Sequence, residues 1–276
     1  MDYIGTTAPA SELANLEAAG ASVISRPFAS RYYICFNERR EVMQNADVRL
    51  AIAKAVDRQE LLDKALSGQG QAALGFAPIA LEWAYNDVDV VPEKDIEGAI
   101  ALLEGAGLTR DADGYFLTLS CPTMSGDDFV NVTTVLKAQL KEIGVNLDMS
   151  TMDDGAFVGV VMSADPDFDM TIISGYAGPD ASAMANRVGT NGSLNLMGYS
   201  NPDVDACYAN ANLTAVTEER AAYFKEAQKL LSVDLPIVPL CEVVVTEVSA
   251  SYLTGTPFSE PNRCTIGEMY KIQFVK

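Results

Sequence analysis

The sequence contains no histidine, and this absence limits the chemistry open to the protein. Without an imidazole, the His-dependent acid–base and nucleophilic mechanisms are excluded. A zinc site with mixed cysteine and histidine ligands is excluded for the same reason. The five cysteines form no Cys-x-x-Cys pair, and most stand in apolar stretches. We therefore interpret them as buried free thiols.

Other motifs of catalysis and nucleotide binding are missing too. The chain has no Gly-x-Ser-x-Gly, Ser-x-x-Lys, Gly-x-Gly-x-x-Gly or Walker A sequence. A calcium loop begins at Asp165, Asp167 and Asp169 but is not completed. Met170 stands where that loop needs glycine, and Tyr176 stands where it needs a bidentate glutamate. We therefore expect no catalytic residue, no metal site and no cofactor.

Basic residues are few, 19 against 38 acidic ones, which leaves a net charge of −19. This excess of acid argues against nucleic acid as a partner, because phosphate binding depends on Lys and Arg. No apolar run approaches the roughly 20 residues of a membrane helix. Residues 1–20 lack the basic start and apolar core of a signal peptide. The protein is therefore cytoplasmic, or its natural chain starts further upstream.

What the sequence does contain is a regular alternation of helical and strand-like periods. Helices are expected over residues 11–19, 45–67 (one or two abutting), 92–106, 127–143, 153–162, 201–213 and 217–233. Strands are expected over residues 21–25, 31–37, 114–121, 145–149, 170–174, 236–248 and 269–275. The alternation between about 93 and 175 predicts an α/β domain. The two ends of the chain are richer in strand, and we expect them to pair with each other.

One stretch, ISGYAGPDAS at residues 173–182, stands out as a candidate site. It follows an apolar strand and contains an aromatic residue, a Gly-Pro turn and a single acid, Asp180. Such a loop fits a binding site. It equally fits a turn before a helix, in which Asp180 caps the helix N-terminus.

Four segments, taken in order, resemble the family 5 (cluster C) extracellular solute-binding proteins of ABC importers, the dipeptide and oligopeptide binders. The first, residues 32–87, has a strand ending in Phe-Asn, the helix DVRLAIAKAVDR, a Gly-x-Gly and an Ala-Pro-Ile turn. The others are VPEKDIEGAIALLEGAGL (91–108), VLKAQLKEIGVNLDM (135–149) and residues 198–240, which begin GYSNPDVDA. Together they cover most of residues 32–240.

The resemblance implies an α/β fold of the type II periplasmic-binding-protein kind, with one complete α/β lobe plus strands that belong to the other lobe. Residues 1–37 would end the first lobe, 38–240 would form the second lobe, and 241–276 would return into the first. The family's chains are longer, so we expect the N-terminal half of the natural protein, with its signal sequence and lipid anchor, to be absent here. In this family the ligand lies between the lobes, which close around a hinge.

The resemblance also suggests which residues bind the ligand. Typical members read Gly-Trp-x-x-Asp after the strand that corresponds to residues 170–174, and the Asp pairs with a peptide's amino terminus. Here Tyr176 keeps the aromatic residue, but Pro179 takes the place of the acid and Asp180 follows it. We therefore predict a site composed of these residues: Tyr176, Ala177, Gly178, Asp180, Ser182, Asn37, Trp83 and Tyr85. For Asn37 the alternative is a bond to backbone at the crossover, and for Trp83 and Tyr85 it is packing in the core.

The function implied is the capture of a peptide or similar small solute for delivery to a membrane permease. The partners would be the ligand and the permease subunits, and the place would be the extracellular face or the periplasm. A ligand-sensing domain of a regulatory protein, built on the same fold, is the alternative. A hydrolase ranks third, because histidine is absent.

Overall fold

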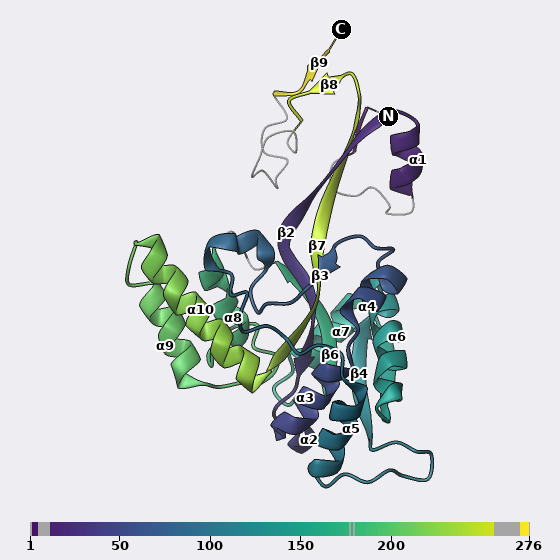
Figure 1. Ribbon diagram of the computed structural model, residues 1–276, viewed down its shortest axis with the longest axis vertical. Coiled ribbons are helices and arrows are strands. Elements are labelled where there is room, and N and C mark those ends of the chain that lie inside the picture. Colours follow the sequence, from purple (N-terminus) through teal and green to yellow (C-terminus); the bar gives the residue numbers. More distant parts are fainter. Residues whose placement is uncertain (1, 5–11, 177, 179, 257–270, 276) are drawn as a thin grey trace.

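The computed structural model describes residues 2–4, 12–176, 178, 180–256 and 271–275. It consists of a large body and a slender arm (Figure 1). We define the body as residues 31–242 and the arm as the described parts of residues 2–30 and 243–275. Both chain termini lie in the arm (Figure 1).

Two long antiparallel strands, β2 (Ala21–Phe36) and β7 (Ile237–Ala250), run through both the arm and the body. Ala21 lies opposite Ala250 in the arm, and Cys35 lies opposite Ile237 in the body. A short strand, β1 (Tyr3–Ile4), pairs with β7 on the side away from β2. The expectation that the two ends of the chain pair with each other is thereby confirmed.

The prediction of two separate strands at 21–25 and 31–37 was wrong, because β2 is continuous. Its pairing with β7 shifts register between Pro27 and Arg31. Proline has no N–H to donate, so it breaks the ladder and the sequence pattern. The strand nevertheless continues through the irregularity, as strands do at bulges. This shift marks the passage from arm to body, and it precedes the lobe boundary predicted after residue 37.

The body contains three strands, β4 (Leu117–Met124), β5 (Val145–Met152) and β6 (Met170–Tyr176), that run in one direction, although β6 belongs to the sheet of β2 and β7. β4 and β5 are parallel. β6 pairs antiparallel with β2 and runs parallel beside β4. This neighbourhood rests on the Asp169 N–H, which donates to Ser120 O at 3.2 Å, and on Thr171 Oγ1, which donates to Pro122 O at 2.7 Å. The carboxyl ends of β4, β5 and β6 therefore share one edge, which faces the arm (Figure 1).

The connections between these strands are helices. α6 (Asp127–Glu142) joins β4 to β5, and α7 (Asp154–Val161) joins β5 to β6. α6 turns one apolar stripe, Val132, Leu136 and Leu140, into the core. The α/β domain expected between about 93 and 175 is confirmed by this strand–helix–strand arrangement.

The other helices lie around the strands of the body, except α1 (Leu13–Ala18), which lies in the arm (Figure 1). In chain order the remaining helices are α1, α2 (Glu41–Gln44), α3 (Ala46–Ala55), α4 (Arg58–Ala65), η2 (Ile79–Ala84), α5 (Ile96–Gly105), η3 (Ala181–Met184), α8 (Ala185–Val188), α9 (Pro202–Ala211) and α10 (Thr217–Asp234). The remaining strands are β3 (Gln71–Ala72), which pairs with β7, and the arm hairpin of β8 (Leu253–Thr254) and β9 (Gln273–Phe274).

The prediction that Pro92 opens a helix was wrong by four residues. α5 begins at Ile96 because Asp95 is its N-cap and accepts a hydrogen bond from the Gly98 amide at 2.9 Å. Lys54 Nζ also donates to Asp95, at 2.7 Å. The lysine comes from α3, so the start of this helix depends on a contact far away in the sequence.

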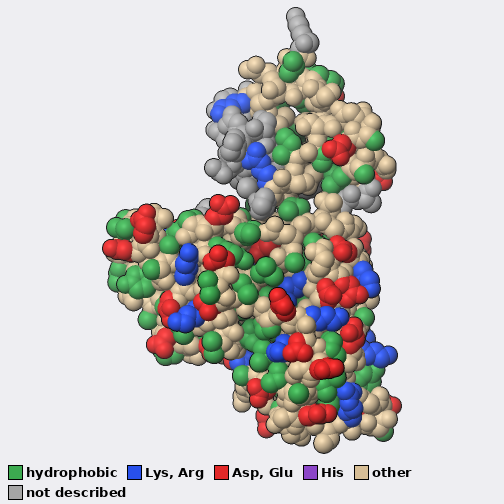
Figure 2. All heavy atoms as spheres, in the orientation of Figure 1, with side chains coloured by type: hydrophobic (Ala, Val, Ile, Leu, Met, Phe, Trp, Pro, Cys, Tyr) green, Lys and Arg blue, Asp and Glu red, His purple; other side chains and the backbone are tan. Residues whose placement is uncertain are grey.

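The interior is apolar, and the surface carries charge of both signs. The four cysteines in the described residues, Cys35, Cys121, Cys207 and Cys241, are all buried free thiols, as expected; Cys264 lies outside the described part. Figure 2 shows acidic side chains scattered over this face of the body rather than gathered in one patch. None of the helices in the described residues combines the length and apolar character needed to cross a bilayer.

Candidate functional site

The candidate site lies at the edge of the body where β4, β5 and β6 end and where β2 and β7 pass into the arm. In open α/β sheets, ligands bind outside the carboxyl ends of the strands. The predicted loop at residues 173–182 occupies this position, because it follows directly from β6. Tyr176 ends β6, and its backbone pairs with Ser30 of β2. The Tyr176 side chain, Ala177 and Pro179 lie outside the described residues, so their roles stay predictions.

Asp180 is held from two sides. As N-cap of η3, it accepts a hydrogen bond from the Ser182 amide at 3.0 Å. Its carboxylate also receives both Nη atoms of Arg220, at 2.7 and 2.8 Å. This bidentate pair lowers the pKa of Asp180 to about 2. Both oxygens accept hydrogen bonds from within the protein, so the capping role that the sequence left open is present.

Arg220 also connects this loop to a second predicted residue, Trp83. The guanidinium lies over the Trp83 ring at 5.3 Å and over the Phe224 ring at 5.4 Å. Trp83 and Phe224 meet edge to face, with ring centroids 5.6 Å apart. Such aromatic and cation–ring contacts each contribute about 1 kcal/mol. Asp180 and Trp83, two candidates that lie far apart in the sequence, therefore both contact Arg220 of α10.

The start of the loop is shaped by Arg187 of α8. Its Nε donates a hydrogen bond to the Tyr33 hydroxyl at 2.8 Å. A Cβ atom on Gly175 would lie only 2.4 Å from Arg187 Nη2, so the guanidinium packs directly on the glycine. Gly178 has φ +81°, which favours glycine, and a Cβ there would approach Ala183 Cβ at 3.1 Å. The close packing at Gly175 and the backbone conformation of Gly178 thus explain why glycine stands at both positions.

Asn37 has a structural role in place of the predicted ligand contact. Its side chain is fully buried, and Nδ2 donates to the carbonyls of Pro166 and Phe168 at 3.0 and 2.8 Å. Its Oδ1 accepts from the Arg39 amide at 3.3 Å. This corrects the assignment of Asn37 to the site: it fastens the end of β2 to the segment before β6 and is closed off from any ligand.

Tyr85 lies beside a buried ion pair. Its ring packs on Gly75, where a Cβ would come within 2.6 Å of the ring. Arg31 of β2 donates to Gly75 O at 2.8 Å and also donates to Phe76 O. Arg31 Nη1 lies 3.9 Å from Glu242 Oε1, and each side chain is 2% exposed. Tyr85 therefore packs on the segment at Gly75 that Arg31 holds in place.

Burial gives the Glu242 carboxyl group an unusually high pKa. Neither carboxylate oxygen has a hydrogen-bond partner among the described residues. Burial raises its pKa from 4.5 to about 7, and the nearby Arg31 guanidinium lowers it only in part. The buried pair of Arg31 and Glu242 therefore joins β2 and β7 where these strands lie side by side, near the proposed site.

Four charged residues that organise this region were not found in the sequence: Arg31, Arg187, Arg220 and Glu242. Each acts through a partner far away along the chain, and no local motif marks such pairs. The only available signal was the scarcity of basic residues in an acidic chain, which makes each arginine in an apolar context worth attention.

Replacing Asp180 with asparagine is expected to change acid stability. The folded-state pKa of about 2 lies below the ordinary 3.8. The ion pair therefore stabilises fully above pH 3.8, and its contribution is lost as the pH falls toward 2. Because the carboxylate is about one-third exposed, we expect D180N to lower the free energy of unfolding by only about 1 kcal/mol at pH 7. Urea unfolding at pH 7 and pH 3 measures this.

The matched control is D154N, at an exposed aspartate in the first turn of α7. It should leave stability at pH 7 within about 0.5 kcal/mol of the parent. An equal loss in both variants would contradict the assigned role of the Asp180–Arg220 pair.

No metal centre is indicated. Within the part of the chain that the structure describes, no three side chains of the metal-binding types come together.

Comparison with known proteins adds to this geometry. Residues 1–195 match the family described as "Bacterial extracellular solute-binding proteins, family 5 Middle". The dipeptide-binding protein of Pseudomonas aeruginosa is 25% identical over 257 residues, which are 91% of this chain and 48% of that protein. Heme-binding protein A of Haemophilus influenzae is 25% identical over 214 residues, 77% of this chain and 39% of its own. The chain thus spans about half the length of the curated relatives it matches.

The solved structures are similar in fold. The ABC transporter substrate binding protein CtaP from Listeria monocytogenes superposes with a TM-score of 0.87 at 22% identity. The alignment covers 100% of this chain and 56% of that one. The type II periplasmic-binding-protein fold expected from the sequence is confirmed.

Proposed function

The chain belongs to family 5 of the bacterial extracellular solute-binding proteins, and we propose that it captures a peptide or similar small solute and passes it to the permease of an ABC importer. Relatives named for binding dipeptides, and an ABC transporter substrate binding protein of the same fold, support this proposal. The relatives are binding proteins by name. The proposed place of action is the extracellular face of the cell or the periplasm.

We propose that residues 38–240, which make up most of the body, form the second lobe, and that residues 1–37 and 241–276, which include the arm, belong to the first lobe. The ligand would lie beyond the carboxyl ends of β4, β5 and β6, where the body faces the arm. The observation that carries this proposal is the interlocked edge at this position. Arg220, Arg187 and Arg31 each fix a different segment near this edge, so the edge is held in place before a ligand arrives. Such preorganisation reduces the entropic cost of binding.

The same edge restricts the ligand class. Asp180 forms a bidentate ion pair with Arg220, and Pro179 occupies the position where peptide binders of the family carry their acid. We therefore do not propose that the loop at residues 173–182 binds a free amino terminus of the ligand. The proposed solute is a peptide or similar compound held through other groups. A heme-binding protein among the relatives shows how far the named ligands differ at this level of identity.

Trp83 supplies a direct test, because it is the single tryptophan of the sequence. We expect its emission to change saturably when the protein, with any upstream sequence of its gene, is titrated with di-, tri- and nonapeptides. The Trp83 ring lies near Arg220 and Phe224. Because Arg220 also pairs with Asp180, a movement of the loop at residues 173–182 changes the surroundings of the ring. The W83F variant should lose the optical signal but still release heat on binding in calorimetry.

Two outcomes would count against this function. One is the absence of saturable binding to every peptide up to about 1 mM, the weak end of specific recognition. The other is small-molecule mass spectrometry of the protein purified from its own cells that finds no co-purifying solute.

A further inference from the structure

A hollow of the body lies at the edge of the sheet away from the proposed ligand site. It has a volume of about 710 Å³ and is bordered by α2, the start of α3, the end of α5, Leu117 at the start of β4, and Asp169 just before β6. Ligand pockets for small molecules generally measure about 300–1,000 Å³. The hollow is therefore large enough for a small organic ligand, and the function proposed above leaves it unused.

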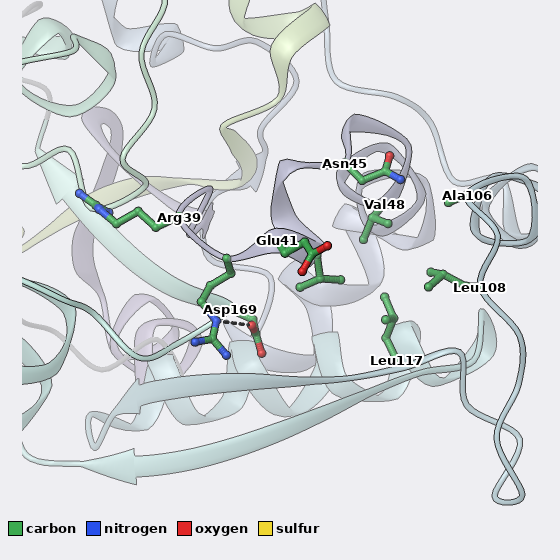
Figure 3. A pocket seen from close by; sticks show the side chains of 10 residues that line it. Arg39, Glu41, Asn45, Val48, Ala106, Leu108, Leu117 and Asp169 are labelled. Carbon is green, nitrogen blue, oxygen red and sulfur yellow. Dashed lines mark hydrogen bonds and ion pairs between the residues drawn. The ribbon is translucent and has the colours of Figure 1, made fainter.

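One wall of the hollow is hydrocarbon. Val48 is buried, and Ala106, Leu108 and Leu117 are half-buried. Leu108 and Leu117 lie across the hollow from Glu41 (Figure 3). This wall can bury an aliphatic chain of a few carbons.

The opposite wall carries charges of both signs, from Arg39, Arg40, Glu41 and Asp169. Arg40 Nε and Nη1 reach Asp169 at 3.2 Å and Asp167 at 3.1 Å, so two acids share this one cation. Arg39 points away from the hollow, and its Nη1 donates to Leu196 O at 3.0 Å (Figure 3). Glu41 is exposed and forms no ion pair with any residue that the structure describes. The hollow therefore offers one uncompensated carboxylate facing a hydrocarbon wall.

We propose that this hollow binds a small alkyl cation, an alkylammonium or alkylguanidinium compound. Its charged head would pair with Glu41, and its hydrocarbon chain would lie against Leu108 and Leu117. The net charge of −19 favours a cation over an anion throughout the approach to the site. The hollow is built from residues of the body alone. Binding there is independent of the function proposed above, and failure of either proposal leaves the other standing.

The test uses n-pentylammonium and n-pentanol as a matched pair of probes, which differ in charge but hardly in size. The chain is labelled at its Val and Leu methyl groups and titrated in an NMR experiment. We expect saturable shifts of the Val48, Leu108 and Leu117 methyl signals with n-pentylammonium. Exposed ion pairs contribute modestly. We therefore expect the parent protein to bind n-pentanol about five- to tenfold more weakly than n-pentylammonium. We expect the E41Q variant to bind n-pentylammonium about five- to tenfold more weakly than the parent does.

The control is E104Q, which removes an exposed acid of α5 that does not border the hollow. It should bind n-pentylammonium as the parent does. The proposal is overturned if no methyl of the hollow shifts saturably, if the two probes bind alike, or if E41Q binds as tightly as the parent. Equal weakening by E41Q and E104Q would also overturn it, since that reports overall charge rather than a site.

Discussion

Replacing Arg31 with methionine is expected to lower the free energy of unfolding by about 3–5 kcal/mol at pH 8. Methionine keeps most of the hydrocarbon volume but leaves the Glu242 carboxylate buried without its cation. It also removes the donor to the carbonyls of Gly75 and Phe76. Loss of one member of a buried pair is costly because the other charge cannot return to water. Urea unfolding followed by circular dichroism measures the effect.

The effect should depend on pH, and the direction follows from Glu242. Its folded-state pKa of about 7 lies above the ordinary 4.5. The contribution of Glu242 to stability is therefore fully present below pH 4.5 and falls as the pH rises through 7, by up to about 3 kcal/mol. R31M should consequently be destabilised less at pH 5, where Glu242 is protonated in the folded protein, than at pH 8.

A matched control isolates the charge. The E242Q variant should show a flatter dependence of stability on pH between 4.5 and 7 than the parent shows. In the E242Q background, R31M should lose the additional destabilisation at high pH. A loss from R31M that is the same at pH 5 and pH 8 would falsify the role assigned to the buried carboxylate.

Replacing Gly70 with alanine is expected to cost about 3 kcal/mol or more, through two separate mechanisms. The backbone at Gly70 has φ +125°, a conformation that residues with a side chain rarely adopt. A Cβ atom there would also lie 2.4 Å from the carbonyl oxygen of Glu242. That oxygen belongs to β7, which is fixed by pairing on both sides, so it cannot move aside. Strain and overpacking of this kind each cost about 1–3 kcal/mol.

Gly68, two residues earlier, provides the comparison. It also has positive φ, +72°, but the nearest atom to its Cβ would be Asp63 Oδ1 at 4.0 Å. G68A therefore carries only the left-handed backbone cost of about 1–2 kcal/mol. Thermal and urea unfolding of the two variants should separate them clearly. Similar losses at the two positions would mean that the approach of Gly70 to β7 is not close in solution.

The sequence allowed the local elements to be predicted where one apolar stripe and clear end signals coincide. Residues 127–143 and 217–233 are helices in the structure because their periodicity alone determines the buried face. The start of α5 and the continuity of β2 were missed because they depend on Lys54 and on pairing with β7. Those contacts join residues that no local pattern connects.

The candidate site was predictable only in part, for the same reason. The loop after β6 was placed correctly at the strand's carboxyl end, but the partner of Asp180 lies 40 residues further along the chain. Asn37 was assigned to the ligand because its neighbours resemble a family motif. The structure shows that the same asparagine closes a buried junction of backbone carbonyls. The sequence indicated that Asn37 has a role, and the structure shows that this role is to bind backbone carbonyls.

The crossing of β2 and β7 also has a consequence for biosynthesis. Phe36 and Ile237, which lie at the body ends of these strands, are separated by roughly 200 residues. At about 5–20 residues per second, a ribosome needs roughly 10–40 s to make the stretch between them. Throughout that time β2 has no partner on its β7 side, while α6 and the parallel pair β4 and β5 can already fold. We expect a nascent chain that ends before residue 237 to expose β2, and chaperones that hold extended strands to meet it there.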